Sequence, residues 1–195
     1  KASLGQVIRT PMILALALCF FGAGFRDMTY ATWSPTFFTE VRGISAQISN
    51  LMTSLAYLGL WGGTIIAGTL FDKKVSPRKF LLLTTIVMII ACLGCFTIPN
   101  SLAVPFMIIL GMLQGFVVST IYFLAPSAVD PVNAAYALAV PNVLLSIGQL
   151  AAPTISGMVI ENAGWLATTV VVEVGAVAMF LAAIWLLKCK GKQEA

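Results

Sequence analysis

Residues 12–38 read MILALALCFFGAGFRDMTYATWSPTFF, a run that is apolar except near its middle. A helix needs about 20 predominantly apolar residues to cross a bilayer, so this run is long enough to span one. Arg26 and Asp27 stand near its centre, where a single charge costs about 3 kcal/mol on insertion scales. Such charges are kept where they face a cavity or pair with each other. We interpret this pair as a functional site, with a purely structural ion pair as the alternative.

The composition of the whole chain is typical of an integral membrane protein. Hydrophobic residues make up 59% of the 195 residues and charged residues only 9%, whereas soluble domains are about 25% charged. The chain has no histidine, the commonest general base and metal ligand, so we expect neither an enzyme nor a metal or cofactor site. The net charge of +4 does not indicate a nucleic-acid partner, because the basic residues stand at the ends of apolar runs.

Six apolar runs qualify as membrane spans by length and composition. We therefore predict an all-α membrane protein with one bundle over residues 1–195 and spans at 12–38, 47–71, 80–98, 103–127, 132–160 and 163–187. Lys and Arg favour the cytoplasmic side of a membrane. Nine of the 11 Lys and Arg residues fall on the side of the two termini, Arg42 falls on the other, and Arg26 lies within the membrane. This distribution predicts a plasma or inner membrane protein with both termini in the cytoplasm.

Glycines recur at packing spacing in two of the predicted spans. Gly59 and Gly63 lie four residues apart in the second span, and Gly111 and Gly115 do so in the fourth. Residues spaced in this way lie on one face of a helix, and small side chains there let a neighbouring backbone come close. We predict tight helix packing at both pairs.

The junction of the second and third runs carries the sharpest motif, residues 68–79, GTLFDKKVSPRK. A glycine here lets a neighbouring helix approach, and the aspartate four residues later lies on the same helix face at the water boundary. The basic cluster can bind anionic lipid, as any cytoplasmic loop of this composition can. The residues that we single out are Gly68, Asp72, Lys73, Arg78 and Lys79.

This order of glycine, aspartate and basic pair resembles the signature loop of the major facilitator superfamily, which lies between the second and third helices of each six-helix half. Two features depart from the pattern: Val75 and Ser76 stand where a glycine is usual, and the basic pair comes about two residues late. The resemblance implies one half of that fold, two three-helix repeats, and here the C-terminal half. Its partner would be the N-terminal six-helix half or a homodimeric mate. We accordingly expect the sequence to be a fragment or split half of a longer chain.

Residues 32–41, TWSPTFFTEV, are similar to the corresponding helix of organophosphate antiporters and related organic-anion transporters. In phosphate-transporting members an arginine on this helix binds the substrate phosphate, which makes Arg26 the candidate here. Arg26 lies about one residue off the family position, where Asp27 falls instead. An arginine beside an aspartate suits a carboxylate or another small organic anion better than a phosphate.

Polar and aromatic side chains recur at helical spacing on four of the runs. The first run carries Arg26, Tyr30 and Trp33 on one stripe. The other runs contribute Tyr57, Gln114, Tyr122, Asn142 and Gln149. In the family these four helices line the central cavity, so the resemblance implies that the side chains contact substrate, and we expect Arg26 to point into a water-accessible cavity. Hydrogen bonding between helices is the alternative for each of the uncharged groups.

The resemblance implies a secondary transporter that moves a small organic anion by alternating access. Asp27 and Glu173 are the candidates for coupling to H⁺ or Na⁺, because both are acids within predicted spans. The alternative is a six-helix membrane module without transport activity, such as a sensor or an assembly subunit. In either case the lipid bilayer is the surrounding partner.

Overall fold

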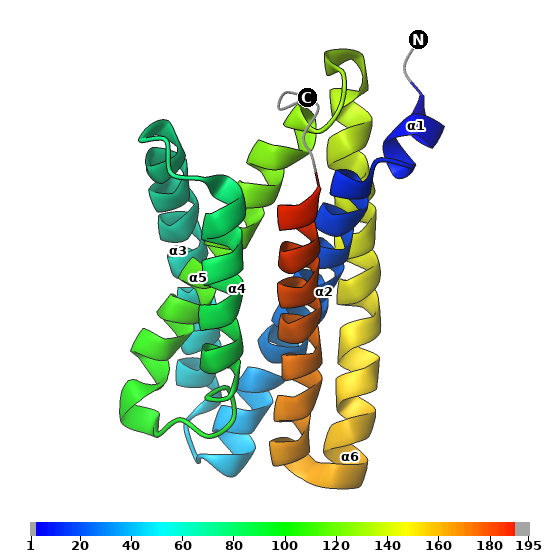
Figure 1. The fold of residues 1–195 in the computed structure, drawn as a ribbon. Coiled ribbons are helices and arrows are strands. Elements are labelled where there is room, and N and C mark those ends of the chain that lie inside the picture. Colours follow the sequence, from blue (N-terminus) through cyan, green and yellow to red (C-terminus); the bar gives the residue numbers. More distant parts are fainter. Residues whose placement is uncertain (1–2, 190–195) are drawn as a thin grey trace.

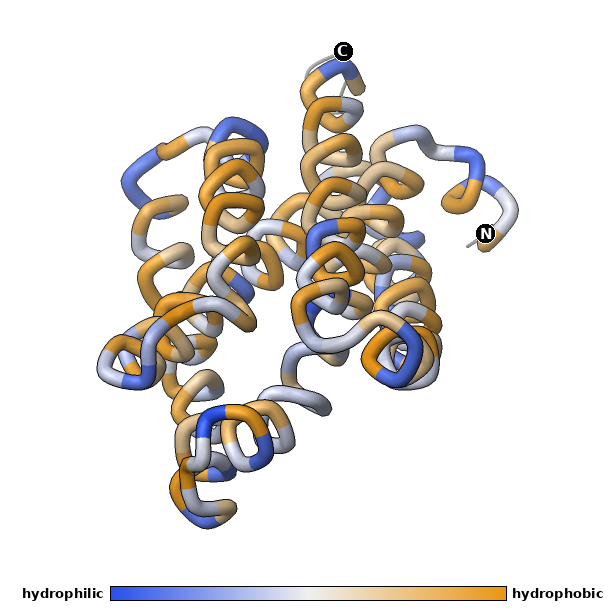
Figure 2. The backbone as a smooth tube through the Cα atoms, turned by 90° about the horizontal axis from the view of Figure 1, so that it is seen from below, coloured by the Kyte–Doolittle hydropathy of each residue, from blue (hydrophilic) through white to orange (hydrophobic). Residues whose placement is uncertain are grey.

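The structure, a computed structural model, describes residues 3–189, and these residues form helices without any β-strand (Figure 1). The elements are α1 (Leu4–Ile8), α2 (Pro11–Thr36), the π-helical turn η1 (Phe37–Val41), α3 (Ala46–Asp72), α4 (Pro77–Cys92), α5 (Asn100–Ser127), the 3₁₀ turn η2 (Pro131–Asn133) and α6 (Ala134–Lys188). Within this part of the chain, four helices are long and apolar enough to cross a membrane: α2 with η1, α3, α5, and α6 with η2. Figure 2 shows that most of the helical tube is hydrophobic or weakly polar and that the strongly hydrophilic segments are short.

Helix α6 is folded back on itself at Gly164, where φ is 80° and ψ is 178°. A positive φ is readily adopted by glycine, which has no Cβ. The first arm (134–163) and the second arm (165–188) therefore run antiparallel (Figure 1). The predicted spans at 132–160 and 163–187 fall on these two arms.

Helix α4 is shorter than the predicted span at 80–98. It ends at Cys92 after 16 residues, which corresponds to about 24 Å of helix. Residues 93–98 form turns instead, with the Gly94 N–H donating to the Ala91 carbonyl at 2.9 Å. A glycine inside the run and Pro99 directly after it explain the early end, because neither residue supports a helix. The division into six spans thus stays a prediction.

Helices α3 and α5 form one close pair. Ideal Cβ atoms built on Gly59 and Gly63 would collide with backbone carbonyls of α5, and those built on Gly111 and Gly115 would collide with backbone carbonyls of α3. All four glycines are buried or nearly so, and they let the two backbones touch directly. The tight packing predicted from the glycine spacing is confirmed.

A second close pair joins α2 to the two arms of α6. A Cβ atom at Gly22 would lie 2.6 Å from the Gly175 carbonyl oxygen on the second arm. A Cβ atom at Gly24 would lie 2.5 Å from the Leu145 carbonyl oxygen on the first arm. Helix α2 packs far less on α3 and α5, and α4 lies against both α5 and α6. The bundle therefore consists of two glycine-packed groups, α3–α5 and α2–α6, which meet along a seam.

The two ends of the described chain lie at the same end of the bundle, together with the loop between α3 and α4 (Figure 1). The basic residues Arg9, Lys73, Lys74 and Lys188 belong to these segments and are exposed. Arg42 directly follows η1. The connection from α2 to α3 lies at the opposite end of the bundle from the loop between α3 and α4 (Figure 1). The exposed basic residues thus gather at one end of the bundle, as the predicted orientation requires. That both termini face the cytoplasm stays a prediction.

Candidate functional site

Helix α2 places Arg26 and Asp27 at the seam between the two helix groups. The Arg26 side chain is 1% exposed, and its Nη2 donates a hydrogen bond to Gln114 Oε1 on α5 at 2.8 Å. The same nitrogen lies 3.3 Å from Asp27 Oδ1. Arg26 Nε is buried and has no hydrogen-bond partner among residues 3–189. The contacts to Gln114 and Asp27 thus use the same nitrogen, and Nε is a buried donor without an acceptor in the described part of the chain.

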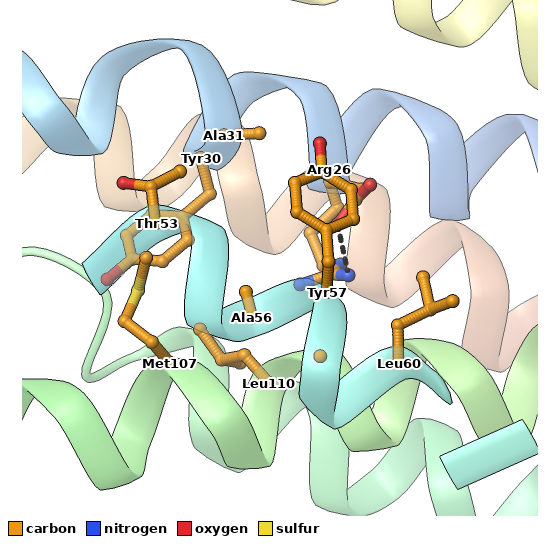
Figure 3. A pocket seen from close by; sticks show the side chains of 11 residues that line it. Arg26, Tyr30, Ala31, Thr53, Ala56, Tyr57, Leu60, Met107 and Leu110 are labelled. Carbon is orange, nitrogen blue, oxygen red and sulfur yellow. Dashed lines mark hydrogen bonds and ion pairs between the residues drawn. The ribbon is translucent and has the colours of Figure 1, made fainter. Parts of the chain in front are cut away.

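The pair lines a narrow pocket between α2, α3 and α5 (Figure 3). The side chains around it are Arg26, Asp27, Tyr30 and Ala31 of α2, Thr53, Ala56, Tyr57 and Leu60 of α3, and Met107, Leu110 and Gly111 of α5. The cavity volume is about 30 Å³, room for no more than a couple of water molecules. The prediction that Arg26 points into an open, water-accessible cavity is therefore wrong for this conformation.

Tyr30 and Tyr57 reach the pocket from different helices. Tyr57 is 54% exposed, so its ring forms part of the outer wall of the pocket. Tyr30 is buried, and its ring packs edge-on against Phe96 at 5.5 Å between centroids. The Tyr30 hydroxyl has no hydrogen-bond partner in the described part of the chain. Of the predicted site residues, the fold therefore brings three to Arg26 and Asp27: the two tyrosines and Gln114, which accepts a hydrogen bond from Arg26.

Trp33, Tyr122, Asn142 and Gln149 do not line this pocket. The Tyr122 hydroxyl donates to Asn142 Oδ1 at 2.9 Å, which joins α5 to the first arm of α6. Gln149 packs beside Gly24 on α2, since its Cγ would lie 3.2 Å from a Cβ there. Tyr122 and Asn142 thus form a second polar contact between the two helix groups, whereas Gln149 packs within the α2–α6 group.

Trp33 was expected on one stripe with Arg26 and Tyr30, but it faces α6. Its Nε1 donates to the Pro153 carbonyl at 3.3 Å, and its ring lies 6.4 Å from that of Trp165. The stripe is continuous along α2, but the neighbours of α2 change along its length. An aromatic cluster built around Phe37, Phe96 and Trp165 occupies this end of the bundle.

The walls of the pocket include residues that the sequence pattern did not single out. Thr53 lines it, and the hydroxyl oxygens of Thr53 and Ser34 lie 3.1 Å apart across the seam. Ser49, Thr53 and Tyr57 recur every four residues on α3, so a polar stripe on that helix was a usable signal. Met107 and Leu110 also line the pocket, but nothing in an apolar run distinguishes such residues from ordinary core.

The acidic candidate Glu173 lies apart from the pocket. It is on the second arm of α6, half-buried, and is not among the lining residues. Its Oε1 is buried and has no hydrogen-bond partner among residues 3–189. The structure does not bring Glu173 and Asp27 to one site.

The loop between α3 and α4 is exposed at Gly68, Asp72, Lys73 and Lys79. No atom of another helix in the described part of the chain lies within 4 Å of the position that a Cβ of Gly68 would occupy. Arg78 is the exception, because its Nη1 donates to the Cys189 carbonyl at 2.8 Å and so ties the start of α4 to the end of α6. The close helix approach expected at Gly68 does not occur within this part of the chain.

The turn after α3 is closed by Lys74 in the left-handed region, with φ of 63°. The Val75 N–H donates to the Leu70 carbonyl at 3.1 Å, and the Lys74 N–H donates to the Phe71 carbonyl at 3.0 Å. This pair of bonds is a Schellman motif, whose left-handed residue is usually glycine. The missing glycine of the signature loop is therefore replaced by a lysine in the left-handed position one residue earlier.

Apolar helices long enough to span a membrane, with a buried arginine beside a partly exposed aspartate at the seam between them, define an integral membrane protein. Among residues 3–189, no three His, Cys, Asp or Glu side chains gather closely enough to hold a metal ion. A family model described as Major Facilitator Superfamily matches residues 16–195. The chain therefore belongs to the Major Facilitator Superfamily, whose members are membrane transporters rather than enzymes. No curated protein sequence matches it.

Proposed function

We propose that this protein is half of a secondary transporter that carries a small organic anion, and that Arg26 binds the anion. The observation that supports the proposal is the buried guanidinium at the seam, with Nε unpartnered and Nη2 shared between Gln114 and Asp27. A cation in a membrane span is costly unless a partner or a ligand compensates it. Tyr30 and Tyr57 supply aromatic walls and hydroxyl groups on either side of it.

The proposal includes alternating access, which is supported by a pocket too narrow for a substrate in this conformation. Few polar contacts cross the seam beside it, chiefly Arg26 to Gln114 and Ser34 to Thr53. The α3–α5 pair and the α2–α6 group are each fixed by glycine contacts, so separation along the seam is the least costly way to widen the pocket. Substrate enters when the seam opens and is enclosed when it closes.

The proposal includes a second bundle that completes the binding site, either an N-terminal six-helix half or another copy. Helix α3 supports this, because Tyr57 is 54% and Trp61 65% exposed on it. Gly68 and Asp72 are exposed at the end of the same helix and are free to meet a helix of the second bundle. We further infer that both termini face the cytoplasm in a plasma or inner membrane.

The test is counterflow of a radiolabelled anion by the full-length protein in proteoliposomes, with L-lactate, D-gluconate, succinate and glycerol 3-phosphate as probes. Wild type exchanges at least one of them, and Arg26→Gln lowers that exchange at least 100-fold while the protein is still inserted. Arg42→Gln is the matched control, because Arg42 lies outside the pocket with its guanidinium 5.2 Å from the Phe37 ring centre. Exchange that survives Arg26→Gln contradicts the assignment of Arg26.

A membrane module without transport activity is the second candidate. The side chain of Arg26 is 1% exposed and donates a hydrogen bond to Gln114. Both features are also expected of a residue that only stabilises the bundle. That role predicts that Arg26→Gln and Arg26→Met unfold the protein in detergent, and that wild type exchanges none of the four probes. Loss of exchange in a variant with unchanged thermal unfolding supports the carrier instead.

A further inference from the structure

A large apolar groove lies between α1, the first half of α2 and the two arms of α6. Its volume is about 760 Å³, and ligand pockets typically measure about 300–1,000 Å³. Leu14 and Leu18 of α2 line it, together with Tyr136 of the first arm of α6 and Trp185 of the second arm. None of the described residues that line it is charged. The groove is therefore suited to an apolar ligand.

The groove opens on the opposite side of α2 from the pocket beside Arg26. Leu18 and Asp27 are nine positions apart, which is roughly two and a half turns of an α-helix, so they lie on opposite faces. Asp27 faces α3 and α5 across the pocket, and α3 carries the exposed Tyr57 and Trp61 at which we place the second bundle. The groove is turned away from this surface, so it faces lipid rather than the second bundle.

The length of the groove fits one leaflet of a bilayer. On the first arm of α6 its lining runs from Tyr136 to Leu144, which corresponds to about 12 Å of helix. The hydrocarbon core is about 30 Å thick, so one leaflet contributes about 15 Å. A membrane-spanning helix would need a groove along the full thickness, whereas the acyl chain of a phospholipid extends through one leaflet. The groove begins at the end of the bundle where α1 and both ends of the described chain lie (Figure 1).

The short helix α1 contributes to the groove at this end. The Ser3 N–H donates to Asn133 Oδ1 at 2.9 Å, and Val7 is buried in the core, so α1 is attached to the start of α6. Leu4 and Ile8 nevertheless remain 46% and 44% exposed, and both line the groove. Hydrocarbon in the groove would cover these two side chains and so favour the attached position of α1.

Aromatic and basic side chains gather at the same end of the groove. Tyr136 and Trp185 line it near the first and last turns of α6, and such side chains lie at the level of lipid headgroups. Arg9 directly follows α1, and Lys188 lies one helical turn beyond Trp185; both are exposed. The nearest acid along these segments is Asp130, which precedes η2 and does not line the groove. An anionic headgroup would therefore meet two cations here.

We propose that this groove binds one anionic phospholipid of the leaflet at the α1 end of the bundle. One acyl chain lies between α2 and the two arms of α6, and the headgroup phosphate binds Arg9 and Lys188. The bound lipid joins α1 to both arms of α6 and stabilises this end of the bundle. The inference does not use Arg26, and it holds whether or not the protein is a carrier.

Native mass spectrometry of the full-length protein in detergent tests the charge of the ligand, with dioleoyl phosphatidylglycerol and dioleoyl phosphatidylcholine as competing probes. Each cation beside an anionic lipid raises the affinity about fivefold, so wild type should retain one phosphatidylglycerol at least tenfold more tightly than phosphatidylcholine. Arg9→Gln combined with Lys188→Gln should reduce this preference to less than threefold. Lys73→Gln combined with Lys74→Gln is the matched control, because both lysines are exposed at the same end of the bundle and outside the groove.

A second pair of variants tests the groove itself. Ala139 lines the groove and is exposed, so Ala139→Trp fills the groove from its open side and should displace the lipid whatever its headgroup. Val170→Trp is the control, because Val170 is exposed on the second arm of α6 outside the groove. Added phosphatidylglycerol should raise the unfolding temperature of wild type and of Val170→Trp, but not that of Ala139→Trp.

A third measurement needs no change in the groove charges or volume. Brominated phosphatidylglycerol in vesicles should quench Trp185, read as the difference in fluorescence between wild type and Trp185→Phe. Absence of this quenching would mean that protein covers the groove, and it overturns the proposal. Equal retention of the two phospholipids by wild type also overturns it, as does a preference that survives loss of Arg9 and Lys188. Lipid retained as tightly by Ala139→Trp as by wild type would place the lipid outside the groove.

Discussion

Two helix contacts in this bundle differ in what makes them. Helices α3 and α5 meet through their backbones, whereas this pair meets α2 through side chains. Between α3 and α5, Gly59, Gly63, Gly111 and Gly115 bring the backbones together, and any added atom collides. Between α2 and the pair, the contacts include side-chain hydrogen bonds and a small cavity beside Arg26. The first contact is backbone against backbone, whereas the second is made by side chains. In the proposed transport cycle, the second contact is therefore the one that opens.

The largest effect is expected from Gly111→Val, which places a side chain against the Ala56 carbonyl. Overpacking typically costs about 1–3 kcal/mol, and here the obstacle is backbone that cannot rotate away. We expect loss of most folded protein, measured by size-exclusion recovery and thermal unfolding in detergent. Gly62→Val on α3 is the control, since nothing lies within 4 Å of its Cβ position. Equal losses in the two variants would refute the rigid pair.

Gln114→Leu tests the seam. It removes the acceptor at 2.8 Å from Arg26 Nη2 and leaves a buried charged donor with only Asp27, at an expected cost of about 1–3 kcal/mol. We expect a lower unfolding temperature and an altered anion affinity in counterflow. Gln149→Leu is the control, because Gln149 is an amide outside the pocket. A variant at position 114 that is as stable as wild type would show that the hydrogen bond does not hold the seam.

Lys74→Gly tests the turn after α3, outside both helix contacts. The left-handed conformation with φ of 63° costs a residue with a Cβ about 1 kcal/mol, and glycine avoids this cost. We expect a small rise in the unfolding temperature. Lys73→Gly, at a φ of −82°, should lower it slightly instead. A rise in both variants would mean that loss of charge, not backbone conformation, is responsible.

The smallest effect is expected from Tyr122→Phe, which removes the bond to Asn142 Oδ1 at 2.9 Å. Hydrogen bonds between membrane helices average about 0.6 kcal/mol, and this one lies where Tyr122 is exposed. Thermal unfolding should therefore change far less than in Gln114→Leu. A change as large as that of Gln114→Leu would remove the distinction between the central seam and the outer contact.

Features that depend on local sequence could be predicted. Most of the long apolar runs form long helices, although α4 ends at Cys92 and not at residue 98, and the glycine pairs of α3 and α5 pack tightly as predicted. Gln114 is predicted to contact substrate, with a hydrogen bond between helices as the alternative, and in the structure it accepts such a bond from Arg26 at 2.8 Å. Each of these features depends on the spacing within one helix or on the cost of a polar group in an apolar surrounding.

Features that depend on how helices cross could not be predicted. Trp33 shares a stripe with Arg26, yet it meets Pro153, because the neighbour of α2 changes along its length. Met107 and Leu110 line the pocket although they look like any apolar core residues. Ser45 stands at the N-cap position before α3, yet its side chain makes no capping hydrogen bond. The openness of the cavity depends on the conformation of the whole bundle, which no single helix encodes.

The reversal of α6 at Gly164 has a consequence for biosynthesis. The chain changes direction within about one residue, and beside the turn only Glu161 and Asn162 carry exposed polar side chains. A turn this short contains no loop that could cross the membrane separately from the helices. The two arms should therefore enter the lipid together, as one helical hairpin. The last quarter of the chain would then be inserted in one step, after the ribosome has released both arms.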